Sequence, residues 1–219
     1  NREKWMIELK ALLVLNGNTL DLNRLNKLGN EVDFILSADG GTNHCLKASL
    51  VPHMVMGDLD SISKDTLDQI KEYNVPIKKF PVKKDKTDAE LSIDYLIQEG
   101  FKDIILVGAI GTRMDHTLAN LLLLNKLKQQ DINSKIIDNK NTIYLVDKKL
   151  VLIKEEDSFL SIVPITNSGI IVTLKGFEYE LERTRIDFGS TFGVSNRIIK
   201  EKGYIYIHEG QCLAIISKD

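Results

Sequence analysis

The chain of 219 residues contains few of the residue types that mark unusual folds: it has 4 prolines, 2 cysteines and 1 tryptophan. With 43% hydrophobic and 27% charged residues, its composition excludes collagen-like, low-complexity and disordered proteins. Cys45 and Cys212 share no metal-binding or redox spacing, so we expect two buried thiols and neither a disulfide nor a nucleophile. Buried thiols of this kind indicate a reducing compartment, which is the cytoplasm.

The sequence also lacks long apolar runs and an excess of charge of either sign. No apolar run approaches the roughly 18 residues of a membrane span, and no signal-peptide pattern is present. The net charge is −2, so no basic field attracts nucleic acid or anionic lipid. We therefore expect a cytoplasmic protein that binds neither nucleic acid nor membranes.

The first two-thirds of the chain alternate short apolar runs with helix-like segments. The strongest strand-like runs are Ala11–Leu15, Val32–Leu36, Met54–Met56 and Asp103–Val107. Strands that alternate with helices form a parallel sheet covered by helices on both faces. Helix starts are indicated by the capping-box spacing of Thr87–Glu90 and by Asp115 as an N-cap. The pattern predicts a Rossmann-like α/β domain over residues 1–146, with a mostly parallel sheet and flanking helices.

From Asp147 onward, short β-rich runs are separated by turn residues, and no helix is indicated. The runs are 150–153, 159–164, 169–174, 204–208 and 213–217. Short strands at this spacing are typical of antiparallel architectures. The sequence therefore predicts a second domain over residues 147–219, folded as a small antiparallel sandwich or barrel.

Polar side chains gather directly after the strand-like runs of the first domain. Asp39 follows one run, Asp58 and Asp60 follow the next, and Arg113 and Asp115 follow a third. Ligands of an open parallel sheet bind outside the carboxyl ends of its strands, so we expect these groups to converge. Taken singly, each acid has a simpler interpretation as a turn, a helix cap or a solvated loop. Their occurrence in several loops of one sheet edge favours a site.

Clustered carboxylates of this kind predict a Mg²⁺ site. Asp58 and Asp60 are two residues apart, so on an extended segment their side chains point the same way. Hard oxygen ligands suit Mg²⁺, which also takes water and substrate phosphate oxygens. Without a cation the acids would repel one another.

Glycines and basic residues near the acids indicate that the substrate carries phosphate. Glycines at 17, 40, 41, 57, 108 and 111 let the backbone approach a bulky anion. Lys83, Lys84, Lys86 and Arg113 could neutralise phosphates, although the lysine run is also typical of a solvated loop. His116 is the histidine expected nearest the site. P-loop, dinucleotide-binding, kinase and serine-hydrolase motifs are absent, so the residues predict a Mg²⁺–phosphate enzyme without naming its substrate.

Five motifs in combination resemble those of thiamine pyrophosphokinases. They are Ser37–Gly41, Gly57–Ile62, Lys86–Asp88, Gly111–His116 and Gly193–Asn196. They occur in the order of that family and cover nearly the whole chain. The resemblance implies an N-terminal α/β domain that binds ATP and Mg²⁺, a C-terminal β-sandwich that binds thiamine, and a homodimer with active sites between subunits. The implied reaction transfers pyrophosphate from ATP to the hydroxyl of thiamine, giving thiamine diphosphate and AMP.

The resemblance also assigns roles to individual residues. The Mg²⁺-binding acids of the family fall on Asp39, Asp58, Asp60 and Asp88. The implied catalytic residues are Asp58, Asp60, Asp88 and Asp115, and either Asp88 or Asp115 could accept the hydroxyl proton. The implied ATP- and thiamine-binding residues are Asn16, Asp39, Gly40, Gly41, Thr87, Arg113, Asp115, Tyr179, Ser195 and Asn196.

Two departures from the family pattern and two rival functions accompany this assignment. Thr112 stands where the family usually has a glycine, and Tyr179 stands where some members have a stacking tryptophan. A pyrophosphokinase acting on a pterin alcohol would use the same acids and differ only in its acceptor pocket. A nucleotide-sensing protein without turnover is the alternative outside enzymes, and the retained acids argue against it.

Overall fold

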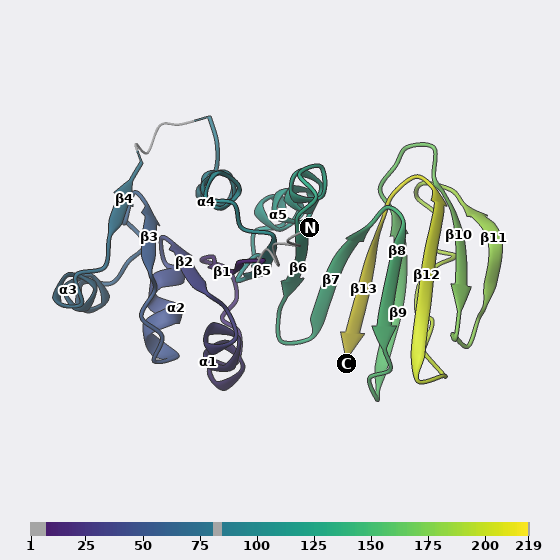
Figure 1. Ribbon diagram of the computed structural model, residues 1–219, viewed down its shortest axis with the longest axis horizontal. Helices are drawn as coiled ribbons and strands as arrows, with labels where there is room; N and C mark the ends of the chain where they lie inside the picture. The colour runs from purple at the N-terminus through teal and green to yellow at the C-terminus, as the bar shows by residue number, and fades with distance from the viewer. Residues whose placement is uncertain (1–7, 81–84, 219) are drawn as a thin grey trace, which may run out of the picture. The chain divides into compact units, whose positions relative to one another are not determined.

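The computed structural model describes residues 8–80 and 85–218, which form two compact units divided between Asn139 and Lys140 (Figure 1). The sequence pattern placed the division after residue 146. It lies earlier because β7 (Asn141–Val146) pairs antiparallel with β13 (Cys212–Lys218). An extended run just before a predicted boundary thus belongs to the sheet of the second unit.

The first unit is an α/β fold, as the sequence predicts. Its elements are β1 (Lys10–Val14), α1 (Leu22–Asn30), β2 (Phe34–Ala38), α2 (Gly41–Lys47), β3 (Met54–Gly57), α3 (Lys64–Glu72), β4 (Ile77–Lys79), α4 (Asp88–Gln98), β5 (Asp103–Val107), α5 (Met114–Lys128) and β6 (Asn133–Ile137). The strands pair in the order β4-β3-β2-β1-β5-β6, and each printed pair is parallel. The carboxyl ends of all six strands therefore lie at one edge.

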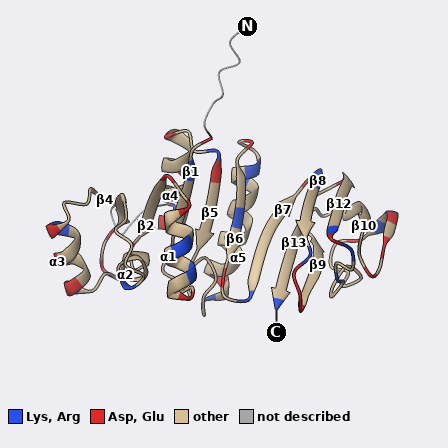
Figure 2. Cartoon of the chain, turned by 60° about the horizontal axis from the view of Figure 1, so that its bottom comes forward, with Lys and Arg blue, Asp and Glu red and all other residues tan. Residues whose placement is uncertain are grey.

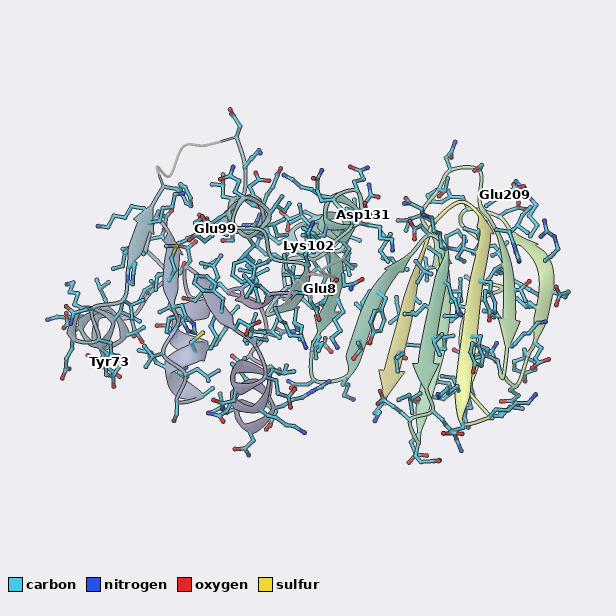
Figure 3. All side chains as sticks on the ribbon, viewed as in Figure 1. Glu8, Tyr73, Glu99, Lys102, Asp131 and Glu209 are labelled. Atoms are coloured by element: carbon cyan, nitrogen blue, oxygen red, sulfur yellow. The ribbon has the colours of Figure 1, made fainter. Side chains whose placement is uncertain are left out.

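The centre of this sheet is apolar on both faces, which explains the continuous hydrophobic runs in the sequence. In β1, Leu12 and Val14 pack in a cluster with Leu25 of α1 and Cys45 of α2. The alternate residues of β1 on the opposite face are also fully buried. Figure 1 shows α1 and α2 on one side of the sheet and α4 and α5 on the other. Charged residues lie mainly on helices and loops, outside the apolar centre of the sheet (Figure 2). Tyr73, at the end of α3, is exposed (Figure 3).

Helix starts were predicted with mixed success. Thr87 caps α4, and its hydroxyl accepts a hydrogen bond from the amide of Glu90 at 3.2 Å, as predicted. The prediction for α5 was wrong, because Arg113 occupies the N-cap position and Asp115 lies inside the first turn. From this position the carboxylate of Asp115 bonds the guanidinium of Arg113.

The long helix α5 presents apolar side chains on two sides. Leu124 and Leu127 are fully buried, whereas Met114, Leu118 and Leu122 are more than half exposed. The exposed three recur every four residues, so they form one stripe along the helix. Apolar periodicity in the sequence did not distinguish this stripe from the buried face.

The second unit is built from two antiparallel sheets packed as a sandwich, and no helix occurs among its described residues. Its remaining elements are β8 (Lys149–Ile153), β9 (Ser158–Pro164), β10 (Ile170–Lys175), β11 (Leu181–Ile186) and β12 (Lys202–Glu209). One sheet has the order β7-β13-β9, and the other has the order β11-β10-β12-β8. Both contribute to a single apolar core, as expected for a sandwich.

Phe177 anchors that core. It is 1% exposed, and a Cβ at Gly203 would lie only 2.6 Å from its ring, so the glycine makes room for the aromatic side chain. Cys45 and Cys212 are buried in their respective units, as predicted, and burial raises the pKa of both thiols to about 12. None of the helices in the described part of the chain has the length and apolar character needed to span a membrane.

Candidate active site

The first unit contains a cavity of about 540 Å³ at the carboxyl edge of its sheet. It is lined by residues that follow β1, β2 and β5 and by the first turns of α4 and α5. Five of the residues assigned to the site from sequence lie in its wall, namely Asn16, Asp39, Thr87, Asp88 and Arg113. His116, the histidine expected near the site, is also in the wall. Of the polar groups expected to converge at this edge, Asp39 and Arg113 line the cavity, whereas Asp58, Asp60 and Asp115 do not.

The loops after β1 and β5 form one wall through direct backbone hydrogen bonds. The amide of Gly17 donates to the carbonyl of Gly108 at 2.8 Å, and the amide of Asn18 donates to the carbonyl of Ile110 at 2.7 Å. A Cβ at Gly17 would lie 2.3 Å from the carbonyl oxygen of Gly108. The close approach requires glycine at this position, and the two loops are held together without side chains.

Two side chains that were not predicted as site residues, His44 and Asn120, bind the backbone of this wall. The imidazole of His44 contacts the carbonyl of Gly17 at 3.1 Å and the hydroxyl of Thr19 at 3.0 Å. Burial lowers the pKa of His44, so a neutral ring bridges the two groups. The buried amide of Asn120 donates to the carbonyl of Ala109 at 2.8 Å. The one signal for Asn120 was a polar residue within the apolar run of α5.

Gly40 and Gly41 serve packing and do not line the cavity. A Cβ at Gly40 would lie 2.1 Å from the side-chain oxygen of Asn16, and a Cβ at Gly41 would lie 2.1 Å from the carbonyl of Val14. Both glycines therefore allow α2 to start directly against the end of β1. This is close backbone approach, as predicted, but toward protein atoms.

Two carboxylates meet in the cavity wall. Asp39, at the end of β2, shares a side-chain hydrogen bond with Asp88, the first residue of α4. Burial and the neighbouring charge of Asp88 raise the pKa of Asp39 from 3.8 to about 7, and Asp58 adds to this shift. Gly57 has a φ of +137°, and a Cβ there would lie 1.8 Å from Asp39 Oδ1. The fold thus brings two like charges together, and the last position of β3 has no room for a side chain beside Asp39.

Asp58 and Asp60 lie in a tight turn beside this pair and outside the cavity wall. The geometric reason given for them from sequence was wrong, because Leu59 has a φ of +73° and the segment is not extended. The amide of Asp60 donates to Asp58 Oδ1 at 3.2 Å, and the hydroxyl of Ser61 donates to Asp60 Oδ1 at 3.0 Å. The amide of Leu59 donates to Asp39 Oδ1 at 3.3 Å, which joins the turn to the acidic pair.

The acids fit a divalent cation in their chemistry. Their oxygens are the hard donors that Mg²⁺ takes, and the raised pKa of Asp39 beside Asp88 marks a charge conflict that a cation would relieve. Among the described residues, no three Asp, Glu, His or Cys side chains are already arranged around a metal position. A Mg²⁺ ion here would therefore need water and phosphate oxygens to complete its coordination, which is its usual behaviour.

Arg113 and Asp115 form a two-pronged ion pair at the rim. Arg113 Nε and Nη2 donate to the carboxylate of Asp115 at 3.2 and 2.6 Å. Hydrogen bonds from Arg113 lower the pKa of Asp115 to about 2. Thr112, where the family pattern has glycine, lies in the cavity wall next to this pair.

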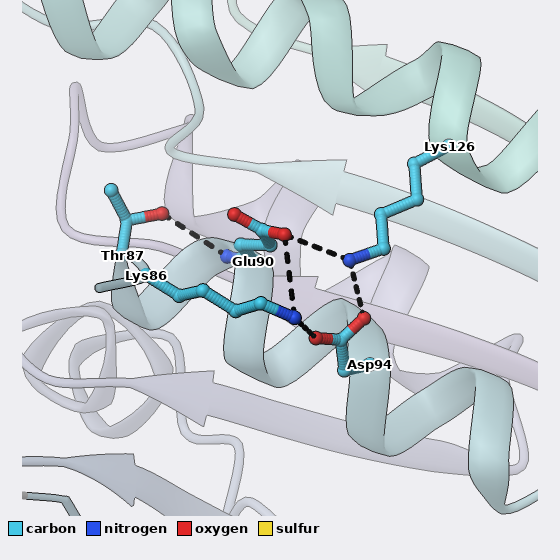
Figure 4. A network of polar contacts seen from close by, with 5 residues as sticks. All are labelled: Lys86, Thr87, Glu90, Asp94 and Lys126. Atoms are coloured by element: carbon cyan, nitrogen blue, oxygen red, sulfur yellow. Dashed lines mark hydrogen bonds and ion pairs between the residues drawn. The ribbon is translucent and has the colours of Figure 1, made fainter. Parts of the chain in front are cut away.

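The lysines expected to neutralise phosphate are placed differently. Lys86 bonds Asp94 at 2.6 Å on the outer side of α4, so its charge is already matched by a carboxylate (Figure 4). Lys83 and Lys84 lie outside the described residues. Arg113 is therefore the one cation of the predicted set that the described structure places in the cavity wall.

In the second unit, the three residues assigned to the site lie near one another. Asn196 is buried, its amide nitrogen donates to the carbonyl of Tyr179 at 2.8 Å, and its amide oxygen accepts from the backbone of Tyr179 at 3.0 Å. The ring of Tyr179 is 63% exposed. Ser195 has a φ of +63°, and its amide donates to the hydroxyl of Ser161 at 3.2 Å. Asn196 thus holds the backbone that presents the tyrosine ring to solvent.

Comparison with known proteins agrees with both halves of this arrangement. A family model described as the catalytic domain of thiamin pyrophosphokinase matches residues 25–136. A second, described as the vitamin B1 binding domain of thiamin pyrophosphokinase, matches residues 148–212. The chain belongs to the thiamine pyrophosphokinase family.

Individual thiamine pyrophosphokinases resemble the chain over most of its length. The thiamine pyrophosphokinase of Bacillus subtilis is 30% identical over 186 residues, which are 84% of this chain and 87% of that protein. Thiamin pyrophosphokinase 1 of Caenorhabditis elegans is 29% identical over 205 residues, covering 87% and 82% of the two chains. The crystal structure of the B. subtilis enzyme superposes with a TM-score of 0.86 at 27% identity, covering 96% of this chain and 99% of that chain.

The acidic pair generates a prediction for the metal-free protein. In EDTA, we expect Asp39→Asn to raise the melting temperature at about pH 8 by about 2–4 °C, corresponding to about 1 kcal/mol for a half-buried group. Near pH 3, below both the ordinary pKa of 3.8 and the raised folded pKa, the carboxyl is mostly neutral in folded and unfolded chains alike, so the substitution should have little effect there. As pH rises toward 7, ionisation favours only the unfolded wild type, because the folded pKa is raised.

Thermal melts of both proteins across this pH range measure the difference directly. Titrating groups that do not contact Asp39 are common to the two proteins and cancel. A melting-temperature difference that does not grow between pH 3 and pH 8 would show that the pKa of Asp39 is not raised in the folded protein.

Proposed function

We propose that this chain catalyses the reaction of its family, in which the pyrophosphoryl group of ATP is transferred to the hydroxyl of thiamine. The hydroxyl oxygen forms a bond to the β-phosphorus of ATP, and the bond between that phosphorus and the oxygen bridging to the α-phosphate breaks. The products are thiamine diphosphate and AMP, and the hydroxyl proton passes to a base. The observation that supports this most directly is the pair of acids, Asp39 and Asp88, in a cavity at the carboxyl edge of the sheet.

Such a transfer requires positioning of the reactants and neutralisation of phosphate charge. In the proposal, Asp39, Asp58, Asp60 and Asp88 hold Mg²⁺, which would screen the polyphosphate when bound. Asp39 and Asp88 line the cavity, while Asp58 and Asp60 border them in the adjoining turn. Asn16 and Thr87 supply hydrogen-bonding side chains in the wall, and the mutually bonded backbone of Gly17 and Gly108 keeps the wall in place.

The sequence left two acids open as the proton acceptor, and the geometry supports different roles for them. The pKa of Asp115 is lowered to about 2 by Arg113, which makes this carboxylate a poor base. Its two-pronged contact fixes the plane of the guanidinium, so in the proposal Asp115 orients Arg113 toward phosphate. Asp88, in the cavity wall, is then the proposed proton acceptor.

The second unit is proposed to bind the acceptor. Thiamine carries a permanent positive charge, and an aromatic face over a cation contributes about 0.5–2 kcal/mol. Tyr179 is proposed to provide this face, with Asn196 holding its backbone and Ser195 offering a hydroxyl. Membership of the thiamine pyrophosphokinase family favours thiamine over a pterin alcohol and favours turnover over nucleotide sensing.

We further propose a homodimer with active sites between subunits. The second unit exposes Tyr179, Phe188 and Phe192 to more than half of their surface. Phe177, an aromatic residue of the same unit, is buried and supports no interface. Large aromatic side chains exposed on one small unit are typical of a surface that a partner covers.

The first prediction from this proposal tests the reaction and its metal. With ATP, Mg²⁺ and thiamine, the protein should form AMP and thiamine diphosphate in equal amounts. We expect Asp58→Asn and Asp60→Asn each to lower kcat by about 10²–10³, because each removes an electrostatic contact at the transferring group. Asp68→Asn, on the exposed side of α3, is the matched control and should retain full activity. Near-normal turnover in a folded Asp58→Asn protein would show that this acid is not part of the site. Formation of AMP with a pterin alcohol but not with thiamine would favour the rival substrate.

A second prediction concerns the acceptor. We expect Tyr179→Ala to raise the thiamine KM several-fold and to leave the ATP KM nearly unchanged, since the ring contacts only thiamine. Tyr179→Phe keeps the aromatic face and should behave as the wild type. Steady-state kinetics of the three proteins with each substrate varied give the result. An equal loss toward both substrates, together with a lower melting temperature, would make Tyr179 a structural residue.

A third prediction concerns assembly. Light scattering at micromolar concentration should give twice the chain mass of 24.7 kDa, because the exposed aromatic side chains are covered in a dimer. Phe192→Asp should shift the mass toward that of a single chain. A wild-type monomer under these conditions would contradict the proposed homodimer.

A further inference from the structure

Four charged side chains form a closed ring beside the start of α4 (Figure 4). Lys126 of α5 contacts Glu90 at 2.9 Å and Asp94 at 2.5 Å. Lys86, two residues before α4 begins, contacts Asp94 at 2.6 Å and Glu90 at 3.6 Å. Each lysine therefore touches both acids, and the ring joins the segment before α4, the helix itself and α5.

The ring is more sheltered than a typical surface ion pair. The side chains of Asp94, Glu90 and Lys126 are 23%, 28% and 30% exposed. Burial alone would raise the pKa of Asp94, yet bonds from Lys126 and Lys86 lower it below its ordinary value. Burial likewise opposes the charge of Lys126, yet Asp94 and Glu90 raise its pKa. Both groups stay charged at neutral pH, so the ring persists under working conditions.

The buried face of α4 does not by itself fix how the helix is rotated. Ala89, Ile93 and Leu96 pack on the sheet side, and such apolar contacts are non-directional. Ser92 adds a fully buried hydroxyl, which has no hydrogen-bond partner in the part of the chain that the structure describes. Away from the contact of Asp88 with Asp39 and that of Lys78 with the ring of Tyr95, the ring of charges supplies directional contacts that join this helix to α5.

Rotation of α4 matters because its first residue is Asp88. The side chains of an α-helix reach about 5–6 Å from its axis, so a 20° rotation would move the carboxylate by about 2 Å. Lengthening a hydrogen bond by that amount breaks it, so the rotation would separate Asp88 from Asp39. Glu90 links the ring to the first turn of α4, because its amide is capped by Thr87 and its carboxylate is held by Lys126.

We infer that Lys126 is a positioning residue for the pyrophosphoryl transfer: from α5 it holds Glu90 and Asp94, and so keeps Asp88 beside Asp39. The inference rests on the proposed function, which gives Asp88 its part in the reaction. It also gives Lys86 a structural place in the ring, in contrast to the phosphate-binding role that its motif suggested. Misplacement of a reacting or positioning group by about 1 Å costs up to about 10² in rate, so a lysine outside the cavity can control turnover.

The test compares Lys126→Met, which keeps the aliphatic stem, with Lys126→Arg, which keeps the charge. Lys71→Met is the matched control, because Lys71 pairs with Asp68 within α3 and touches no part of the ring. Hydrogen exchange of the wild type and variants is followed in peptides covering residues 87–93 and 94–99 of α4. Steady-state kinetics with ATP and thiamine are measured well below the melting temperature of each variant.

In Lys126→Met, exchange of residues 87–93 should accelerate about tenfold more than exchange of residues 94–99, because the first turn loses its anchor. We expect kcat to fall about tenfold or more, with the thiamine KM changed less than twofold. Lys126→Arg should restore both properties, and Lys71→Met should match the wild type. If Lys126→Met does not fold, Asp94→Asn removes one contact of each lysine and should show the same pattern more weakly.

Two results would overturn the inference. One is exchange that rises equally along α4, which would make the ring a general stabiliser of the helix. The other is an unchanged kcat in a variant whose first turn exchanges faster. Failure of the proposed function would be seen separately, as absence of AMP with the wild type, and would leave the exchange comparison intact.

Discussion

The like charges of Asp39 and Asp88 meet in the cavity wall, and much of the first unit is arranged so that they stay there. Two carboxylates in contact repel each other unless they share a proton or a cation, so neither side chain would adopt this position by itself. The restraint comes from different directions. Gly57 leaves space for Asp39 where a Cβ would overlap its carboxylate, and the amide of Leu59 donates to it. Thr87 caps the helix that begins with Asp88.

The two units position the polar groups of the candidate site by different structural means. In the first unit, groups converge because parallel strands end at one edge, and the loops beyond that edge are bonded backbone to backbone. In the second unit, one buried amide, that of Asn196, satisfies both backbone groups of Tyr179 and leaves the ring exposed. The buried side chain of Asn196 thereby fixes the position of the exposed Tyr179, although the two residues are 17 positions apart in the chain.

Much of the fold follows from hydrophobic patterning, and the residues that deviate show what patterning omits. The apolar runs predicted the parallel sheet because both of its faces are covered, and the turn-rich second half predicted the sandwich. Patterning placed β7 in the wrong unit, since a strand's sequence does not state its pairing partner. It also does not distinguish the exposed Leu118 from the buried Phe177, because apolar residues occur both in cores and on surfaces.

The location of the candidate site was predictable from sequence, and its contacts were less so. Acids placed after strands pointed to the edge of the sheet at which the cavity lies, and their residue type is the basis for proposing a cation there. The roles of Asp115, Lys86 and Asn196 depended on partners distant in space or already engaged, and no spacing rule reports them. The family motifs predict a set of site residues without distinguishing those that line the cavity from those that hold others in place.

The backbone hydrogen bonds that join the loops after β1 and β5 have a consequence for the energetics of ligand binding. The amides of Gly17 and Asn18 are tied to carbonyls of the neighbouring loop, and His44 braces the same segment from α2. A loop ordered in this way has little conformational entropy left to lose when an anion arrives. The wall is preorganised, so under the proposed function its contacts with a polyphosphate would contribute to affinity without an opposing cost of loop ordering.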